Sequence, residues 1–397
     1  MALPTELPGR VRVLKDGAEV DLARLESFSF EDVDIGTDKA KFSFDNEDLS
    51  VLEDPTWRRG QRLTVSWGTL ANMKPPRDVI VEGFSGLETL EITTRGVITL
   101  MNRVKKTRAF KNMTDSEVAT QVAEENGYAG AAARISATTR KRGTVNQIGV
   151  TDAVFLASLA RRHGFIFNVR DTGMYWGPRN LDARPSVSIG YRGADADAQA
   201  LRAGLDSDIE AATGAVALKG LDPETGKQFE TEAKSGDSGH TSLSDTHEVP
   251  DGRTAMWQIE KWLGSSTGGA ASHATKEEAK EEADRRFDQA AKRRFTMKID
   301  IEGAAAPVFA ATIARLVGFG AYISGNYYVE KVNDSIDGSG YVSSIELNRD
   351  GPSKSPESTD EMAAKDKVND AGKKPGEGEM KEVLDPRTSQ WRLQRSD

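Results

Sequence analysis

The residues that commonly do chemistry in proteins are few in this chain or stand in uninformative patterns. It has four histidines and no cysteine, which excludes a thiol nucleophile, a disulfide and a thiolate metal site. It has no Walker-type phosphate loop and no Gly-x-Ser-x-Gly nucleophile motif. Carboxylates are abundant, but none stands in a context that marks a glycosidase pair, although a pair is not excluded. We therefore predict no catalytic residue.

Three places resemble metal sites or bases, and each has a simpler interpretation. His163 lies in the last turn of an expected helix, where the helix dipole stabilises a cation. Asp195 and Asp197 lie in an alanine-rich turn without further oxygen ligands at the spacing of a calcium loop. His240 and His247 are seven residues apart in a polar loop, which is a weak zinc signal. We expect no metal and no cofactor.

Strand patterns dominate the elements that would position any site. Near the C-terminus, FTMKIDI from Phe295 alternates apolar and polar residues and predicts a half-buried strand. Two further strands, YYVEKVNDSI and YVSSIELNR, are joined at Asp337-Gly338, which predicts a hairpin. In its second strand Tyr341, Ile345 and Leu347 share one side, as in a barrel or sandwich wall with one packed face.

The N-terminal part shows the same character. A turn at Asp16-Gly17 predicts a first hairpin, and SFSFEDVDI and AKFSFDN predict two phenylalanine-rich strands around Gly36. WRRGQRLTVSWG, DVIVEGFSG and LEITTRGVITLMNR predict further strands. Short strands without intervening helices predict a β-barrel or sandwich that ends near Arg108.

The middle of the chain has helical signals. Thr114 and Glu117 form a capping-box pattern for a short helix that Gly127 ends. A second helix is predicted after Thr151 and ends at Gly164. FIFNVRDTGMYWGP then predicts another hairpin.

The next segments vary in character. Beyond a strand at Val187, ADADAQALRAGLDSDIE at 194–210 has a helix-like composition, and a strand is predicted at 214–218. Residues 222–274 are predicted to be a polar insertion loop, and 275–294 a charged helix that faces solvent or another subunit.

The last 47 residues, 351–397, are predicted to form a disordered or extended tail, because residues 350–378 are almost free of apolar side chains. Five apolar residues near its end could order on a partner. They are Met380, Val383, Leu384, Trp391 and Leu393. The alternative is a frayed end without a role.

Two stretches carry a family resemblance. Gly318-Phe319-Gly320, then GNYYV from Gly325 and the Gly340-Tyr341 hairpin, resembles the last β-domain of phage late control D proteins. DAVFLASLARRHGFIFNV resembles the middle domain of the same family. These proteins are baseplate hubs of contractile tails, and they are related to the hub part of the type VI secretion protein VgrG.

The resemblance implies a β-rich α+β chain in which two β-barrel-like hub domains flank a mixed α/β domain. The corresponding division is 1–108 for the first barrel, 109–186 for the mixed domain, 187–350 for the second barrel and 351–397 for the tail.

The resemblance also implies a function without catalysis. The chain would be a homotrimeric hub that joins the tail tube to a separate spike and forms part of the central channel. Its partners would be the spike, the tube or tube-initiator protein, other baseplate subunits and, in the channel, the tape measure protein. The alternatives are a peptidoglycan-degrading tail hydrolase, and the hub of a tailocin or phage-derived injection system.

Composition sets outer limits on these interpretations. The net charge is -9, which argues against a surface that holds DNA through its phosphates, so DNA would pass without sequence-specific binding. No stretch reaches the roughly 18 to 20 apolar residues that span a bilayer, and we expect no membrane span. We expect assembly in the host cytoplasm and a final location in the virion baseplate.

Overall fold

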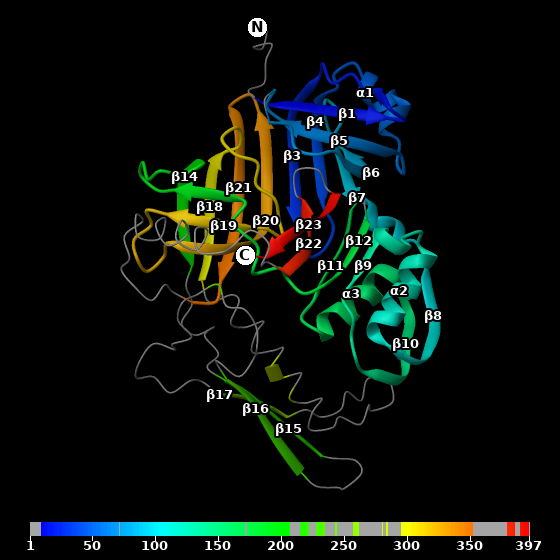
Figure 1. Cartoon of the computed structure of the whole chain (residues 1–397). Helices are drawn as coiled ribbons and strands as arrows, with labels where there is room; N and C mark the ends of the chain where they lie inside the picture. Colours follow the sequence, from blue (N-terminus) through cyan, green and yellow to red (C-terminus); the bar gives the residue numbers. More distant parts are fainter. Residues whose placement is uncertain are drawn as a thin grey trace.

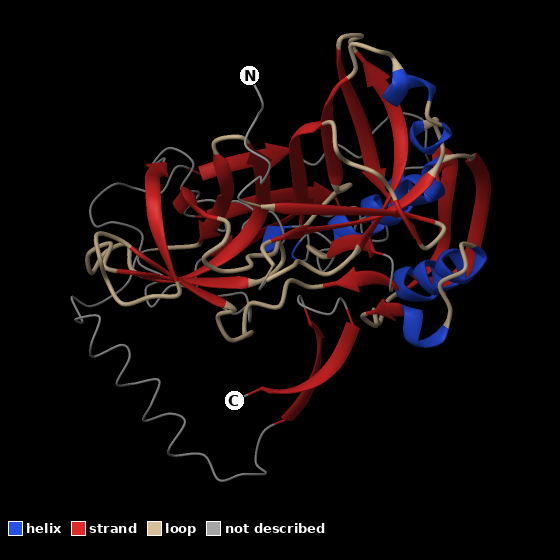
Figure 2. Cartoon of the chain, turned by 90° about the horizontal axis from the view of Figure 1, so that it is seen from above, coloured by secondary structure: helices blue, strands red, loops and turns tan. Residues whose placement is uncertain are grey.

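The computed structural model describes residues 9–70, 72–170, 173–206, 215–221, 228–234, 243, 257–261, 280, 283–284, 295–351, 379–385 and 390–396. The described strands form one large sheet and four small ones, and the helices gather on one side of the molecule (Figures 1 and 2). The predicted β-rich α+β fold class is confirmed.

The first ninety-odd residues form a β-region with short helical turns. Its elements are β1 (Arg10–Lys15), β2 (Ala18–Glu19), β3 (Leu25–Val33), β4 (Lys39–Asp45), α1 (Ser50–Glu53), η1 (Pro55–Trp57), β5 (Arg62–Gly68), β6 (Arg77–Ser85), β7 (Thr89–Gly96) and η2 (Val97–Asn102). The predicted hairpin at Asp16-Gly17 is confirmed, since both residues have positive φ and β1 pairs with β2.

A mixed region follows. Its elements are β8 (Lys105–Thr114), α2 (Asp115–Glu125), η3 (Gly130–Ala132), β9 (Ala133–Ile135), β10 (Lys141–Thr151), α3 (Asp152–Arg162), β11 (Ile166–Arg170) and β12 (Gly173–Gly177). Both predicted helices are confirmed, and Thr114 and Glu117 make the reciprocal hydrogen bonds of a capping box.

The C-terminal half is again built of strands. Its elements are β13 (Val187–Gly190), β14 (Ala198–Asp206), β15 (Ala215–Leu221), β16 (Gln228–Lys234), β17 (Trp257–Lys261), β18 (Phe295–Glu302), β19 (Ile313–Val317), β20 (Gly325–Asp337), β21 (Gly340–Arg349), β22 (Glu379–Asp385) and β23 (Gln390–Ser396). The predicted strand from Phe295 and the hairpin around Asp337-Gly338 are confirmed.

Part of this half closes into a β-barrel. The strands follow the order β19-β13-β14-β18-β21-β20, and β20 pairs back onto β19. The inward side chains of β18 and β21, among them Met297, Ile299, Ile345 and Leu347, are buried in a single hydrophobic cluster. The pairing of β20 with β19 closes the barrel, and the closed barrel surrounds this core.

The long strand β20 belongs to two structures at once. Beyond its barrel neighbours it pairs with β3, from Lys331 opposite Val33 to Ile336 opposite Phe28. The sheet then continues through β3-β4-β7-β6-β5-β1-β2 (Figure 1). With 13 residues, β20 is roughly 43 Å long, enough to serve the barrel and the N-terminal sheet together.

The core of the N-terminal sheet is aromatic and receives residues from the far end of the chain. Phe30 stacks on Trp67 with ring centroids 4.0 Å apart. Ile336 of β20 and Tyr341 of β21 are buried in the same cluster. The first and last β-regions therefore share a core as well as a sheet.

The mixed region has its own hydrophobic cluster. Phe110 of β8 stacks on Phe155 of α3, and Trp176 of β12 donates a hydrogen bond to the carbonyl of Leu156. This cluster already includes Val97, so side chains from the end of the predicted first domain pack into it. The exact division of the chain into domains stays a prediction.

The helix predicted at 194–210 is wrong over its described part, which contains the strand β14. β14 pairs with β18 from Ala200 opposite Ile301 to Asp206 opposite Thr296. Pairing with a neighbour distant in the sequence overrides the helix propensity of the alanines. In the same way, Val97–Asn102, predicted as strand, forms a 3-10 helix.

Several predicted segments lie wholly or largely outside the described residues. In the predicted insertion 222–274, β16 and β17 pair with β15 on either side. In the predicted helix 275–294, Lys280, Ala283 and Asp284 are helical, and Lys280 pairs with Asp284 at 3.0 Å. His240 and His247 fall outside the described residues.

The shared core makes a prediction about cooperativity. Ile336→Ala removes a fully buried side chain of β20 from the N-terminal cluster, which should lower the free energy of unfolding by about 2 to 4 kcal/mol. Calorimetry should show the N-terminal sheet and the barrel unfolding in one transition that moves as a whole. Leu201→Ala, at an exposed position, is the control. Two transitions of which only one shifts would contradict a shared core.

Candidate functional site

The polar groups with several buried hydrogen bonds and ion pairs in the described structure lie mainly where its regions meet. We call these places junctions. Among described residues, no cluster of three or more His, Asp or Glu side chains could hold a metal ion. No helix in the described part of the chain is long and apolar enough to cross a membrane.

The first junction joins the loop after β5 to the β20–β21 hairpin. Lys74 Nζ lies 2.6 Å from Asp334 Oδ2 and donates at 2.6 Å to the carbonyl of Val308. Trp67 Nε1 donates to the same carboxylate at 2.7 Å, and Ser343 Oγ donates to its other oxygen at 2.5 Å. Both charged side chains are almost completely buried. The ammonium is thus held where the first and last β-regions meet.

The second junction adds the mixed region. Arg170 of β11 pairs with Asp32 at the end of β3 at 2.9 Å, and Ala310 N donates to the other oxygen of Asp32 at 3.0 Å. Asn168 Nδ2 donates to the carbonyl of Val33 at 3.1 Å. One carboxylate thereby bonds to groups from the mixed region and from the C-terminal half.

A third ion pair lies just beyond the end of β3. Arg179 pairs with Asp34 at 2.7 Å and lies 3.7 Å from Glu330 of β20. Its guanidinium lies over the ring of Tyr328, 4.4 Å from the centroid. Asp34 N also donates to the carbonyl of Glu330 at 3.1 Å. These contacts hold the segment after β12 against β3 and β20.

Burial changes the acidity of the carboxyls at this junction. Desolvation raises the pKa of Asp34 to about 6, although the neighbouring Arg179 opposes the shift. Desolvation, with the nearby Asp32 carboxyl, also raises the pKa of Asp38 to about 6, against the pull of Arg170 and Arg77. Both side chains are buried, so these shifted groups are not placed to meet a substrate.

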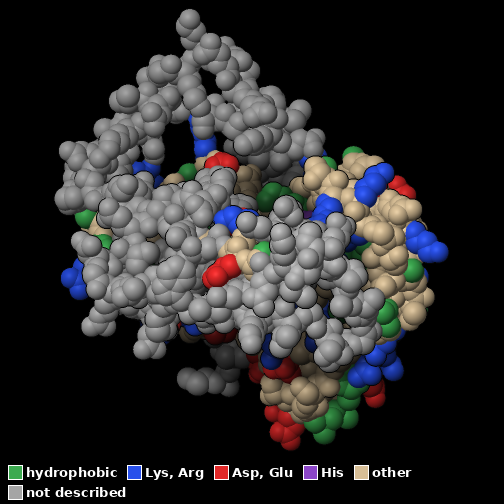
Figure 3. All heavy atoms as spheres, turned by 90° about the horizontal axis from the view of Figure 1, so that it is seen from below, with side chains coloured by type: hydrophobic (Ala, Val, Ile, Leu, Met, Phe, Trp, Pro, Cys, Tyr) green, Lys and Arg blue, Asp and Glu red, His purple; other side chains and the backbone are tan. Residues whose placement is uncertain are grey.

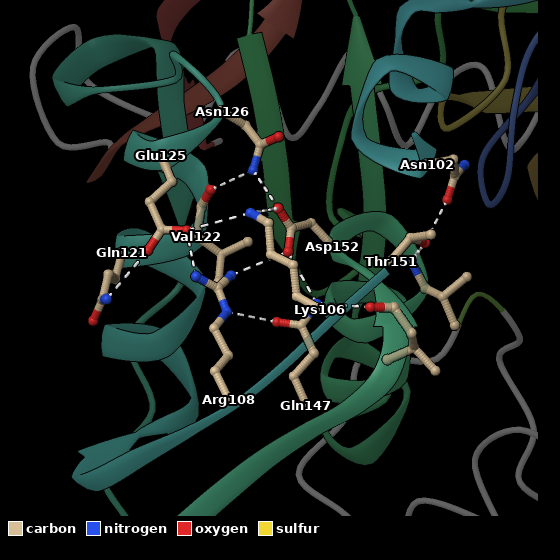
Figure 4. A network of polar contacts seen from close by, with 12 residues as sticks. Asn102, Lys106, Arg108, Gln121, Val122, Glu125, Asn126, Gln147, Thr151 and Asp152 are labelled. Atoms are coloured by element: carbon tan, nitrogen blue, oxygen red, sulfur yellow. Dashed lines mark hydrogen bonds and ion pairs between the residues drawn. The ribbon is translucent and has the colours of Figure 1, made fainter. Parts of the chain in front are cut away.

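A separate polar network lies within the mixed region (Figure 4). Asp152, at the start of α3, accepts hydrogen bonds from four side chains at 2.6 to 3.0 Å. The donors are Lys106, Arg108, Asn126 and Gln147. Arg108 also pairs with Glu125 near the end of α2 and donates to Gln147 at 2.7 Å. The network thus connects β8, β10 and both helices.

This network does not have the acid–base character of a catalytic site. Against the opposing effect of its burial, the hydrogen bonds from Asn126 and Lys106 lower the pKa of Asp152. A carboxylate with a lowered pKa and four donors is a poor general base. The arrangement therefore orients α2 and α3 over the β8–β10 ribbon.

His163 has a partner that sequence reasoning missed. It is the C-cap of α3, as the dipole interpretation requires, but its Nε2 lies 2.8 Å from Asp115 Oδ2 at the start of α2. Arg142 also approaches this carboxylate at 3.3 Å. Only the folded chain reveals this pair, because 48 residues separate the two positions. Asp197, considered as a metal ligand, instead accepts hydrogen bonds from Ser188 N and Oγ.

The predicted partner-binding residues of the tail fall in the β22–β23 hairpin. Leu384 is paired with Trp391, and Leu393 with Glu382. Met380 and Val383 lie in the same ladder, opposite Arg395 and Arg392. The role of these residues stays a prediction.

The fold is similar to solved tail proteins over most of the chain. A tail protein from Neisseria meningitidis matches with a TM-score of 0.63 and 13% identity, covering 86% of this chain and 97% of that one. A 43 kDa tail protein of prophage MuSo2 from Shewanella oneidensis matches with a TM-score of 0.61 and 13% identity, covering 86% and 98%.

A third structure connects this fold with secretion. It is an E. coli component of the type VI secretion system that is structurally similar to the T4 bacteriophage tail proteins gp27 and gp5. It matches with a TM-score of 0.53 and 10% identity, covering 82% of this chain and 73% of that one. The chain has the fold of these tail proteins. The resemblance noted in the sequence is thus confirmed at the level of the fold.

A sequence family also matches. The model described as the Alg8 N-terminal domain matches residues 83–338, more than half of the chain, and the chain belongs to that family. This match begins inside β6 and ends between β20 and β21, so its bounds cut through the large sheet. No curated protein matches the chain.

The first junction predicts a large energetic effect for one carboxylate. Asp334→Ala leaves the ammonium of Lys74 buried without its counter-ion and should lower the free energy of unfolding by about 3 to 5 kcal/mol, measured by denaturant titration. Glu91→Ala, which breaks the exposed pair with Lys41, is the control and should change stability little. Equal effects of the two substitutions would show that burial of the first pair is energetically unimportant.

The second junction predicts a pH dependence. The folded-state pKa of Asp38 lies above its unfolded value, so the folded state binds more protons and stability falls as pH rises from about 4 to about 6. Asp38→Asn removes this titration while keeping an acceptor for Val33 N. The melting temperature of the variant minus that of the wild type should therefore rise across this range, by the equivalent of about 2 kcal/mol, and then level off. A difference that does not change with pH would refute the raised pKa.

Proposed function

We propose that this protein is the central hub of a contractile phage tail, a structural subunit that joins the tail tube to a separate spike. The observation that carries the proposal is the fold, which matches two solved tail proteins over 86% of the chain. The hub of a tailocin or a phage-derived injection system would use the same geometry. The particle would be distinguished by the genes around this one.

The shared sheet fits the mechanical task of a hub. Such a subunit must hold two β-regions in a fixed relation while other subunits bind on both sides. Here a continuous ladder through β20 and β3 joins the regions, and the buried Lys74–Asp334 pair fixes the loop beside it. Breaking the pair would leave a buried charge, which opposes relative movement of the two regions.

A trimer would convert this arrangement into a ring. Three chains, each with two β-regions, would present six similar β-lobes around a channel and so connect a three-fold spike to a six-fold tube. In the ring the chain would contact the spike, the tube or tube-initiator protein and other baseplate subunits. The tape measure protein and then DNA would pass through the channel, assembly would occur in the host cytoplasm, and the product would be part of the virion.

The proposed role is not enzymatic. The solved tail proteins with the same fold are named for their structural place in the particle. The buried acids with raised pKa, Asp34 and Asp38, are enclosed by the junction, and the most connected carboxylate, Asp152, is held by four donors. No observation specifically favours the alternative of a peptidoglycan hydrolase.

The role as a hub predicts a trimer without wall-degrading activity. Light scattering should give three copies per particle, for the protein alone or mixed with its spike, because closure of a ring requires the partner copies. Zymography on peptidoglycan should show no clearing. A monomer that persists with the spike present would contradict the hub, and clearing that one carboxylate replacement abolishes would favour the hydrolase.

We further propose that the tail hairpin is a tethered clip for a neighbouring baseplate subunit. A two-stranded hairpin is marginal by itself and gains stability from a partner. The 27 residues of segment 352–378 would act as a tether, which would raise the local concentration of the hairpin at a neighbour. Trp391 would be the anchor, since one buried tryptophan commonly dominates a small interface.

The clip predicts a defect in assembly without a defect in folding. Deleting residues 351–397 should leave the melting temperature and the trimer unchanged and lower the yield of complete baseplates, counted by electron microscopy. Trp391→Ala should reproduce most of the loss, and Gln394→Ala in the same strand is the matched control. Baseplates at the wild-type yield from the truncated protein would show that the tail is only a solvated end.

A further inference from the structure

One surface of the mixed region stands apart from the junctions and from the tail. The strands β8 and β10 form a two-stranded ribbon, paired from Lys105 opposite Thr151 to Thr114 opposite Lys141. One face of the ribbon packs on the helices through Phe110 and Val145. The other face is exposed, and it presents Lys105, Thr107, Ala109 and Lys111 of β8 with Thr144 and Asn146 of β10. We call this face the ribbon surface.

The ribbon carries a concentration of positive charge in an acidic protein. Residues 103–114 and 140–151 contain no Asp or Glu, while the whole chain has a net charge of -9. Their basic residues are Arg103, Lys105, Lys106, Arg108, Lys111, Arg140, Lys141 and Arg142. Figure 3 shows Lys and Arg side chains over the side of the molecule on which the mixed region lies.

These cations divide by their position on the ribbon. Lys106 and Arg108 point to the helix side, where Asp152 and Glu125 neutralise them (Figure 4). Arg103, Lys105 and Lys111 are exposed, and none of the three has an ion-pair partner among the described residues. The internal network therefore neutralises the inward charges and leaves the outward ones exposed to solvent.

Exposed apolar side chains lie at one end of the ribbon. Val104 is 61% exposed, Ile148 60% and Val154 52%. Because the strands are antiparallel, the start of β8 lies beside the end of β10 and the first turn of α3, which brings the three positions to the same end. Ile148 adjoins a β-bulge, where Gly149 N donates to Thr107 Oγ1 at 3.1 Å.

We propose that the ribbon surface binds an acidic segment of another protein, with apolar residues that cover Val104 and Ile148. Protein interfaces usually combine an apolar patch with polar and charged groups beside it. Complementary charge would steer the acidic partner to this side of a protein whose overall charge repels it. Nucleic acid fits less well, since phosphates gain nothing from exposed valine and isoleucine and the net charge opposes them.

Synthetic peptides test the proposal without knowledge of the partner. The first labelled peptide has glutamates on both sides of two leucines, the second replaces the leucines with serine, and a labelled DNA duplex is the third probe. Fluorescence anisotropy with the full chain should show binding of the first peptide that weakens with salt and is tighter than that of the other two probes. Absence of binding at low salt, or tighter binding of the duplex, would overturn the proposal.

Variants locate the binding. The double variant Lys105→Glu with Lys111→Glu should bind the leucine-containing peptide about tenfold or more weakly than the wild type does. The control, Arg10→Glu with Arg202→Glu, changes the net charge equally at exposed positions on other strands and should have little effect. Equal weakening by both pairs would show that only net charge matters, and the site would be rejected.

The apolar end of the ribbon is tested by its own pair of substitutions. The double variant Val104→Ser with Ile148→Ser should bind the leucine-containing peptide about threefold or more weakly than the wild type does. Its affinity for the serine peptide should not change. If this variant binds both peptides as the wild type does, the partner's apolar residues do not cover Val104 and Ile148. Circular dichroism checks the fold of each variant, and Lys105→Gln with Lys111→Gln replaces the charge reversal if that pair fails to fold.

Discussion

The pairing of β20 with β3 is the interaction on which the rest of the structure depends. It joins a closed barrel from the end of the chain to a sheet from its beginning, across about 300 residues of sequence. The ladder also fixes the position of Asp334, which lies opposite Phe30. That position allows Trp67 and Lys74 of the N-terminal region to reach one buried carboxylate.

The buried ion pairs fix the relative position of the two β-regions at the contact between β20 and β3. A purely apolar contact between two β-regions tolerates slippage, whereas a buried ion pair is strongly unfavourable unless its partners meet. Asp32, Asp34 and Asp334 each find a cation of another segment within 3 Å. Through Arg170 the mixed region is fixed to the same contact, so the three regions meet around the end of β3. This common anchoring supports the proposed role as a hub, in which the subunit would transmit force between a spike and a tube.

Local patterns in the sequence predicted the local structure well. The capping box at Thr114, the strand from Phe295 and the hairpin at Asp337-Gly338 depend on residues within a few positions of one another, and all three are confirmed. The glycine and strand patterns also carried the resemblance that the fold comparison confirms.

The errors and omissions concern partners far apart in the sequence. β14 contains alanines and charges typical of a helix, and only its ladder with β18 makes it a strand. Lys74 stands between a loop and two prolines, like an ordinary surface lysine, yet its counter-ion is 260 residues away. The pairing of His163 with Asp115 is equally invisible locally. Composition alone singles out the tail residues from Met380 to Leu393, and their proposed role depends on a partner.

An electron cryomicroscopy map of the purified oligomer would show directly whether the two β-regions of each chain are joined within a ring. We expect a three-fold ring of six β-lobes around an open channel, in which each chain contributes two lobes joined by continuous density for β20 and β3. A map in which the two β-regions of a chain are separate, or in which no ring encloses a channel, would contradict it.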